Sequence, residues 1–122
     1  MERIWLALGA ANAFLAVAAG AFGAHGLKAR LTPDLLAVFE TGARYHMYHA
    51  LGLLAVGLFA MHRPSGMITA SGWAMLAGIV IFSGSLYALS LSGVRVLGAI
   101  TPIGGVAFLA GWVLFAIAAQ RS

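Results

Sequence analysis

The chain has 122 residues, of which 62% are hydrophobic and 8% are charged, whereas soluble domains carry about 25% charged residues. Seven Lys or Arg, three Asp or Glu and a net charge of +4 exclude a water-soluble globule, because so few charges do not cover the surface of a small domain. They also exclude a disordered tail and a nucleic-acid partner, since the basic residues are scattered singly and form no patch. The absence of cysteine excludes disulfides and thiolate metal sites.

Four long stretches without formal charge predict four transmembrane helices. A bilayer core needs about 20 apolar residues as helix, and a helix satisfies its own backbone hydrogen bonds in lipid. We place the spans at residues 4–24, 43–61, 67–91 and 97–119. Short loops between the later spans make neighbouring helices antiparallel. The predicted fold is therefore an all-α, integral membrane four-helix bundle in a single transmembrane domain, residues 1–122.

The connection at residues 25–42 predicts a further, short helix. Thr32-Pro33-Asp34 is typical of a helix start, because Thr caps a helix, Pro suits its first position and Asp complements the positive end of the dipole. The residues on one side of the following turns are apolar: Leu35, Leu36 and Phe39. This pattern predicts an amphipathic helix at the membrane interface that leads into the second span.

The first span carries small residues on one side and bulky residues on the other. The small stripe consists of Gly9, Ala13, Ala16, Gly20 and Gly23. The bulky side consists of Ile4, Leu8, Phe14, Leu15 and Phe22. Because helices associate in lipid through close packing of small residues, we expect the small stripe to face the bundle. Asn12 lies at its margin and should hydrogen-bond to another helix, since an unpaired amide is costly in lipid.

The third span shows a less regular pattern, because Phe82 and Leu89 fall on the same face as its small residues. Those small residues are Ser71, Ala74, Gly78, Ser85 and Ser92. Aromatic residues near predicted helix ends are typical of interfacial anchors, and here they are Trp5, Tyr45, Tyr48 and Trp73. Trp112 lies deeper, so its indole N–H should have a hydrogen-bond partner.

Thr101-Pro102 leaves two alternatives for the fourth span. Proline within a helix removes a hydrogen bond and kinks the helix. The helix therefore either kinks here or begins here, with Thr101 as cap and Pro102 at the first position. Because transporters bind substrates at broken helices, Thr101 is also a candidate binding residue.

The other candidate ligand-binding residues are the polar groups nearest the membrane body: Asn12, His25, Arg44 and His49. His46 and His49 lie three residues apart on one predicted helix face, so a metal or haem site with His25 as a third ligand is one hypothesis, because imidazole binds iron, copper and zinc. No carboxylate lies at ligand spacing on that face, and hydrogen bonds to neighbouring helices are the simpler role. We therefore predict no cofactor.

The three carboxylates do not form a catalytic set. Glu2 is near the terminus, and Asp34 and Glu40 lie on the connection between the first two spans. The sequence has no phosphate-binding loop, metalloprotease motif or serine-hydrolase spacing, and no acid within a span, where a proton-coupled transporter would have one. The sequence therefore predicts a protein that is not an enzyme.

Four ordered motifs cover nearly the whole chain. They are Gly20-Ala21-Phe22-Gly23-Ala24-His25-Gly26-Leu27, then Thr41-Gly42 with Tyr45-His46 and His49-Ala50-Leu51, then Phe82-Ser83-Gly84-Ser85-Leu86-Tyr87, and finally Thr101-Pro102-Ile103-Gly104-Gly105 with Phe108 and Gly111-Trp112. Together they resemble the motifs of small bacterial inner-membrane proteins grouped as domain of unknown function four-hundred-and-twenty-three. The resemblance implies a multi-pass protein of the inner membrane with four helices, and no activity. Because some members carry Gln at the position of His46, it implies His25 and His49 as the stronger motif histidines.

The sequence leaves three hypotheses for function. The first is a non-enzymatic packing or accessory protein in contact with the lipid bilayer, as a homo-oligomer or a subunit of a membrane complex. The second is a binding or transport module for a small lipid-like or quinone-like ligand, and the third is a His-ligated metal or haem protein. Convergence of His25 and His49 with Asn12, Ser85 or Thr101 on a cavity would favour binding, whereas burial against apolar walls would favour packing.

Overall fold

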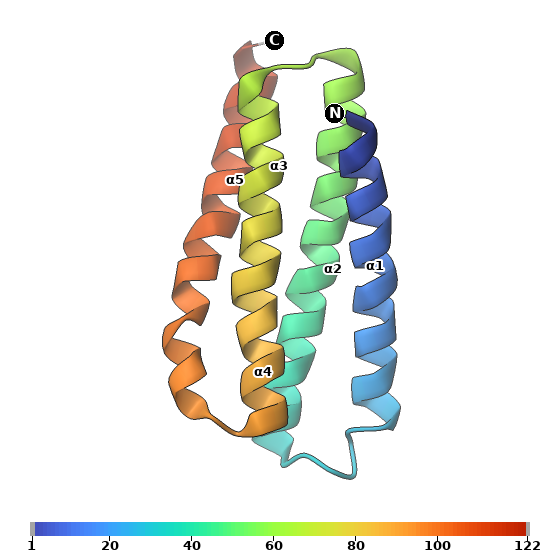
Figure 1. Ribbon diagram of the computed structural model, residues 1–122, viewed down its shortest axis with the longest axis vertical. Helices are drawn as coiled ribbons and strands as arrows, with labels where there is room; N and C mark the ends of the chain where they lie inside the picture. The colour runs from blue at the N-terminus through green and yellow to red at the C-terminus, as the bar shows by residue number, and fades with distance from the viewer. Residues whose placement is uncertain (1, 122) are drawn as a thin grey trace.

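The computed structural model describes residues 2–121, and the regular structure within them is entirely helical. Its elements in chain order are α1 (Glu2–His25), α2 (Pro33–His62), α3 (Gly66–Gly78), the π-helical turn η1 (Ile79–Ser83), α4 (Gly84–Ser92), the 3-10 helix η2 (Arg95–Ala99) and α5 (Thr101–Arg121). The elements α3, η1 and α4 form one continuous rod (Figure 1). Neighbouring rods are antiparallel, and α1 begins at the same end of the bundle at which α5 ends.

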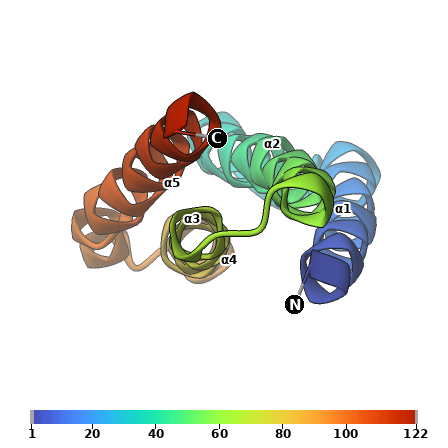
Figure 2. The ribbon, with the colours of Figure 1, turned by 90° about the horizontal axis from the view of Figure 1, so that it is seen from above.

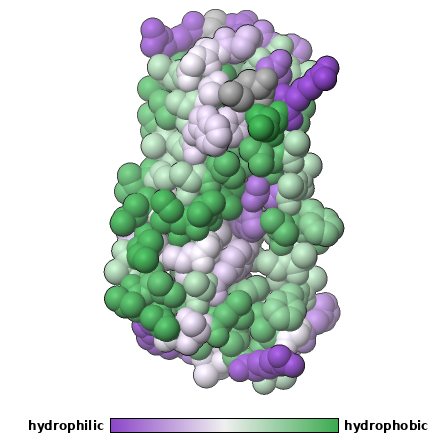
Figure 3. Space-filling model, viewed as in Figure 1, coloured by the Kyte–Doolittle hydropathy of each residue, from purple (hydrophilic) through white to green (hydrophobic). Residues whose placement is uncertain are grey.

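Three helical runs are long and apolar enough to cross a membrane: Glu2–His25, Gly66–Ser92 and Arg95–Arg121. Figure 3 shows mainly apolar residues across the middle of the face in view, with a small hydrophilic patch among them, and most hydrophilic residues at the two ends. The predicted all-α class is confirmed. Three of the four predicted spans coincide with helical runs that are long and apolar enough to cross a membrane. The predicted fourth span is not confirmed, because the polar and aromatic residues between Tyr45 and His49 make α2 less apolar than the other runs.

The helix α2 begins where the sequence predicts a helix start. Thr32 is the N-cap, its hydroxyl oxygen accepts a hydrogen bond from the N–H of Leu35, and Pro33 occupies the first turn. A separate interfacial helix within residues 25–42 is not confirmed, since α2 continues without interruption to His62. Gly42 remains helical and packs against α4, where a Cβ atom on it would lie 3.2 Å from the Cβ atom of Leu86.

The four rods do not contact one another equally. α1 packs mainly on α2, α3 packs on α5 and α2, and α4 packs on α2. Viewed from above, α1 and α5 lie at opposite sides of the bundle, with α2 and the α3–α4 rod between them (Figure 2). The backbones of α3 and α5 lie close together, and the Ser71 hydroxyl donates a buried hydrogen bond of 2.6 Å to the carbonyl of Gly111.

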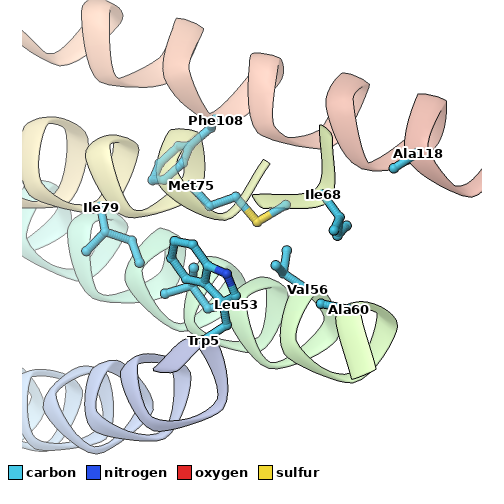
Figure 4. Close-up of a cluster of buried hydrophobic side chains, with 9 residues drawn as sticks. All are labelled: Trp5, Leu53, Val56, Ala60, Ile68, Met75, Ile79, Phe108 and Ala118. Atoms are coloured by element: carbon cyan, nitrogen blue, oxygen red, sulfur yellow. The ribbon is translucent and has the colours of Figure 1, made fainter. Parts of the chain in front are cut away.

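A cluster of buried apolar side chains joins the rods (Figure 4): Trp5, Leu53, Val56, Ala60, Ile68, Met75, Ile79, Phe108 and Ala118. The prediction that Trp5 is an interfacial anchor is wrong, because its side chain is fully buried. Gly72 on α3 leaves room for it, since a Cβ atom there would lie 2.8 Å from the indole, and Trp73 packs edge-on at 5.1 Å between ring centroids.

The stripe of small residues on α1 faces the bundle in part, because a Cβ atom on Gly20 would meet nothing within 4 Å and Leu8 of the bulky side packs against the core. Gly9, Ala16 and Gly23 are buried, whereas Phe14 and Phe22 on the bulky side are exposed. The contact is close, because a Cβ atom on Gly9 would lie 2.9 Å from the backbone nitrogen of Leu54 on α2. Small residues therefore let α1 and α2 approach each other in the way that membrane helices commonly do.

The third span contains a π turn, η1, between its two α-helical segments. A π-helical turn takes about one residue more than an α-helical turn, so every later residue is rotated by about 100°. The buried residues include Ser71 and Gly78 before the turn and Ser85 and Leu89 after it, whereas Ser92 at the end of the rod is exposed.

The fourth rod settles the alternatives at Thr101-Pro102. The chain forms the 3-10 helix η2, and α5 then begins at Thr101, with Pro102 in its first turn. A missing N–H does no harm there, because the first turn of a helix has no intrahelical acceptors for its N–H groups. The helix begins at this point rather than kinking around an internal proline.

Candidate functional site

The predicted binding residues lie in separate places in the structure. Asn12 joins a cluster around His46, whereas His49 lies at a groove on the side of α5. The Thr101 hydroxyl shares a hydrogen bond of 2.6 Å with that of Ser85. His25 and Arg44 are exposed, so no single cavity gathers the whole predicted set.

The first cluster is built around His46 and connects three helices. The Asn12 amide nitrogen donates to the carbonyl of Leu8 (2.8 Å), so its oxygen is the acceptor for His46 Nε2–H (2.8 Å). His46 Nδ1 lies 2.9 Å from the Tyr87 hydroxyl, and in the neutral ring it accepts that proton. The cluster, which we name the Asn12–His46–Tyr87 triad, therefore links α1, α2 and α4. It confirms the prediction that Asn12 bonds to another helix.

The second cluster is built around His49 and connects α2 with α5. His49 Nδ1 lies 2.8 Å from the backbone carbonyl of Tyr45, and Trp112 Nε1–H donates to His49 Nε2 at 3.0 Å. A carbonyl only accepts and an indole N–H only donates, so the proton of this imidazole is on Nδ1. The ring also stacks on Phe108, with 3.5 Å between centroids and 8° between planes. The prediction that the Trp112 N–H has a partner is confirmed.

The ring nitrogens of His46 and His49 do not fit a metal ion or haem that both histidines would bind. All four ring nitrogens are already hydrogen-bonded within the protein, and the two rings bond to different helices: His46 to α1 and α4, His49 to α5. Within residues 2–121 no group of three or more potential ligands is assembled. Coordination at His46 would require a helix–helix hydrogen bond to break, and coordination at His49 would break its bond to Trp112 or its bond to the carbonyl of Tyr45 in its own helix.

A groove with a volume of about 660 Å³ lies between α2 and α5. We name it the α2–α5 groove. Its wall is almost entirely apolar and is formed chiefly by Tyr45, Tyr48, Phe82, Pro102, Gly105 and Trp112. Gly105 leaves part of this space open, because the nearest atom to a Cβ atom on it would be a ring carbon of Phe82 at 3.9 Å.

A second hollow, with a volume of about 460 Å³, lies beside the Asn12–His46–Tyr87 triad. We name it the α1–α4 hollow. Its wall includes the three triad residues together with Leu15, Val80 and Gly84. A Cβ atom on Gly84 would meet nothing within 4 Å, so the hollow extends over this glycine. Tyr87 was not among the predicted site residues, although it ends the third sequence motif.

The charged end of the bundle carries an ion pair between α2 and η2. Arg95 donates to Asp34 at 2.7 Å, and both side chains are exposed. The hydroxyl of Thr32 and then the guanidinium of Arg95 lower the pKa of the Asp34 carboxyl from 3.8 to about 2. The carboxylate therefore remains ionised over most of the pH range, and it ties the start of α2 to the segment that precedes α5.

Comparisons with known proteins identify relatives that are membrane proteins. A family model described as "Protein of unknown function (DUF423)" matches residues 19–105. UPF0382 membrane protein YwdK of Bacillus subtilis is 52% identical over 120 residues, which is 98% of each chain. UPF0382 membrane protein SERP0230 of Staphylococcus epidermidis is 50% identical over 119 residues, or 98% of this chain and 97% of the relative. No solved structure matches. The resemblance inferred from the four motifs is therefore confirmed, and the chain belongs to the DUF423 family of membrane proteins.

Proposed function

We propose that this membrane protein is a non-enzymatic binding protein that holds a small lipid-like or quinone-like molecule in the α2–α5 groove. The observation that supports this function is the aromatic wall of the groove. A preformed apolar cleft of several hundred cubic ångströms is typical of small-molecule sites. The α2–α5 groove has this size, and Tyr45 and Tyr48 are among the residues of its wall.

The aromatic rings of the groove support one another in a continuous series. Tyr48, Tyr45, Phe82 and Phe108 follow with 5.4, 5.0 and 5.2 Å between successive ring centroids. His49 then stacks on Phe108 and accepts the indole hydrogen bond. Because each ring is held by its neighbours, little side-chain entropy would be lost when a flat or branched apolar molecule binds.

The position of the groove favours an amphipathic molecule. Arg44 is exposed and precedes Tyr48 by one helical turn, so both lie on the same side of α2. Arg44 is therefore placed to contact the polar end of a molecule whose apolar part lies along the rings. Of the remaining predicted binding residues, His49 contributes to the wall, and Thr101 directly precedes Pro102 at its edge.

This function requires α2 to cross the membrane as a fourth span. With 30 residues the helix is about 45 Å long, which exceeds the thickness of a bilayer core. His46 and His49 lower its hydropathy, yet their ring nitrogens are hydrogen-bonded to protein groups and would not face lipid unpaired. The other rods also cover much of α2, which supports a central place in the bundle.

Native mass spectrometry in a mild detergent tests this function. We expect the purified protein to retain a bound molecule of defined mass that is extractable into organic solvent. Gly105→Leu should fill the groove and abolish retention, whereas Gly20→Leu is the matched control, because a Cβ atom on Gly20 meets nothing within 4 Å and Gly20 is not part of the groove wall. Equal retention by the native protein and both variants would contradict the proposal.

A second candidate function is that of an accessory protein that packs against another copy or another membrane protein. The observation that favours it is the position of α1 at the edge of the bundle, where only 17% of its apolar window is buried, against 44% for Gly66–Ser92. The same spectra test it. A dimer or a heteromeric complex would support this candidate, and a strict monomer without protein partners would contradict it.

A further inference from the structure

We propose that the α1–α4 hollow is a second binding site, which takes a neutral, membrane-soluble molecule with a carbonyl oxygen, such as a quinone. The two sites share no wall residue. The hollow opens beside the Asn12–His46–Tyr87 triad, whereas the α2–α5 groove lies beside His49. An experiment can therefore refute this inference without refuting the proposed function.

The hydrogen-bond capacity of the triad determines which ligand atom fits. The Asn12 amide has two N–H groups, and one of them donates to the carbonyl of Leu8. The second N–H has no acceptor among residues 2–121, while the Asn12 oxygen and both nitrogens of His46 are engaged. The Tyr87 proton goes to His46, so the triad offers one further N–H donor to a ligand. A carbonyl oxygen is the matching acceptor.

The location of the hollow determines the charge of the ligand. Asn12 lies near the middle of α1, far from the charged ends of the bundle, and the hollow wall contains no Lys, Arg, Asp or Glu. A carboxylate or phosphate placed there would lose its hydration without meeting a cation, which is costly in a bilayer. The ligand must therefore be neutral at the end that approaches the triad.

The π turn forms part of the wall of the hollow. Val80 in η1 and Gly84 at the start of α4 both belong to its wall, and Val80 is 66% exposed. With no side chain, Gly84 leaves open space over the rod next to Tyr87. π-helical turns occur frequently at functional sites, because they interrupt the regular packing of a helix. Here the turn lies next to a polar cluster in the middle of an apolar rod.

Photoaffinity labelling of the full chain in phosphatidylcholine vesicles tests this proposal. The probe is a benzoquinone with a short alkyl tail that carries a diazirine, and the labelled peptides are identified by mass spectrometry. We expect labelling of the peptides that contain Leu15 and Val80, and we expect unlabelled decyl-benzoquinone to compete with it. Gly84→Leu should reduce this labelling roughly ten-fold, as expected for the loss of about 1.4 kcal/mol of binding free energy.

Matched variants distinguish the possible outcomes. Gly105→Leu and Gly20→Leu should leave labelling of the hollow unchanged, because neither residue belongs to its wall. A hydrocarbon diazirine without a carbonyl should not compete, and if it competes equally, the hollow accepts lipid chains and the proposal is overturned. Labelling that is not saturable, or that persists in Gly84→Leu, also overturns it. If labelling is confined to α2 and α5 and is lost in Gly105→Leu, the second site is refuted while the proposed function stands.

Discussion

His46 and His49 lie one turn apart on α2, yet they hold the bundle together in different ways. His46 is bonded through both nitrogens to side chains of other helices, Asn12 on α1 and Tyr87 on α4. His49 uses one nitrogen for its own helix and the other for Trp112, and its ring stacks on Phe108. The His46 region therefore depends on directed polar contacts, and the His49 region depends mainly on aromatic packing.

This difference shows that two histidines at neighbouring positions need not form one site. Residues three apart on a helix differ in direction by about 60°, which is enough to direct each ring into a separate helix–helix interface. In lipid, an unpaired imidazole nitrogen would be costly, and each ring has hydrogen-bond partners for both of its nitrogens, although one partner of His49 belongs to α2 itself. Substitutions in the His46 region and substitutions in the His49 region should therefore change the free energy of unfolding independently.

The largest effect should come from Gly104→Leu, which disrupts the packing of the His49 region. A Cβ atom on Gly104 would overlap the backbone nitrogen of Phe82, and backbone atoms cannot yield as a flexible side chain can. We expect the free energy of unfolding to fall by about 3 kcal/mol, the upper part of the usual range for overpacking. Unfolding in mixed micelles with increasing dodecyl sulfate measures it. Gly105→Leu is the adjacent control, and an equal loss there would contradict the close approach.

A smaller effect should follow from Asn12→Leu, which breaks the His46 region. The variant leaves His46 Nε2–H without its acceptor, so we expect a loss of about 1–2 kcal/mol in the free energy of unfolding. Tyr87→Phe removes the hydroxyl on the other side of the ring. A double-mutant cycle between the two substitutions should give a non-additive result, because both act through one imidazole. Strict additivity would show that the triad does not act as a unit.

Trp112→Phe, in the His49 region, should lower the free energy of unfolding by less than Asn12→Leu does. It removes the indole donor to His49 Nε2 but keeps an aromatic ring at the groove, so the expected loss is about 1 kcal/mol. The same unfolding titration measures it. Combination with Asn12→Leu should be additive, since the two residues belong to different clusters and share no partner. A coupling between them would mean that the two histidine regions respond to each other.

The smallest effect concerns Asp34, outside both histidine regions. Its pKa is lowered to about 2 in the folded protein, so its stabilising contribution is present above an ordinary pKa near 3.8 and is lost as the pH falls towards 2. We expect Asp34→Asn to lower the melting temperature slightly at pH 6, with the difference from the native protein disappearing near pH 2. Glu40→Gln is the charge control on the same helix. A difference that persists at pH 2 would rule out the ionised carboxylate as its cause.

The sequence alone predicted the features that depend on local pattern. Apolar length predicted the rods, Thr32 and Pro33 predicted the start of α2, and the cost of an unpaired amide predicted an interhelical partner for Asn12. These inferences need only the chemistry of a residue and its neighbours in the chain. The identity of each partner needs the relative register of two helices, which no local pattern contains.

Two residues illustrate this limit. Trp5 was assigned to the membrane interface from its position near a helix end, but Gly72 on a distant helix provides the space that buries it. The role of Tyr87 does not follow from the sequence, because its partner His46 lies 41 residues away on another helix. Both cases depend on a contact far along the chain.

The π turn has a consequence for how this sequence can change. In effect η1 is a single-residue insertion in a transmembrane helix, and deleting one residue from Ile79–Ser83 would restore a regular α-helix. The deletion would also rotate α4 by about 100° and direct Tyr87 away from His46. The hydrogen bond between Tyr87 and His46 therefore depends on the residue that η1 adds to the rod.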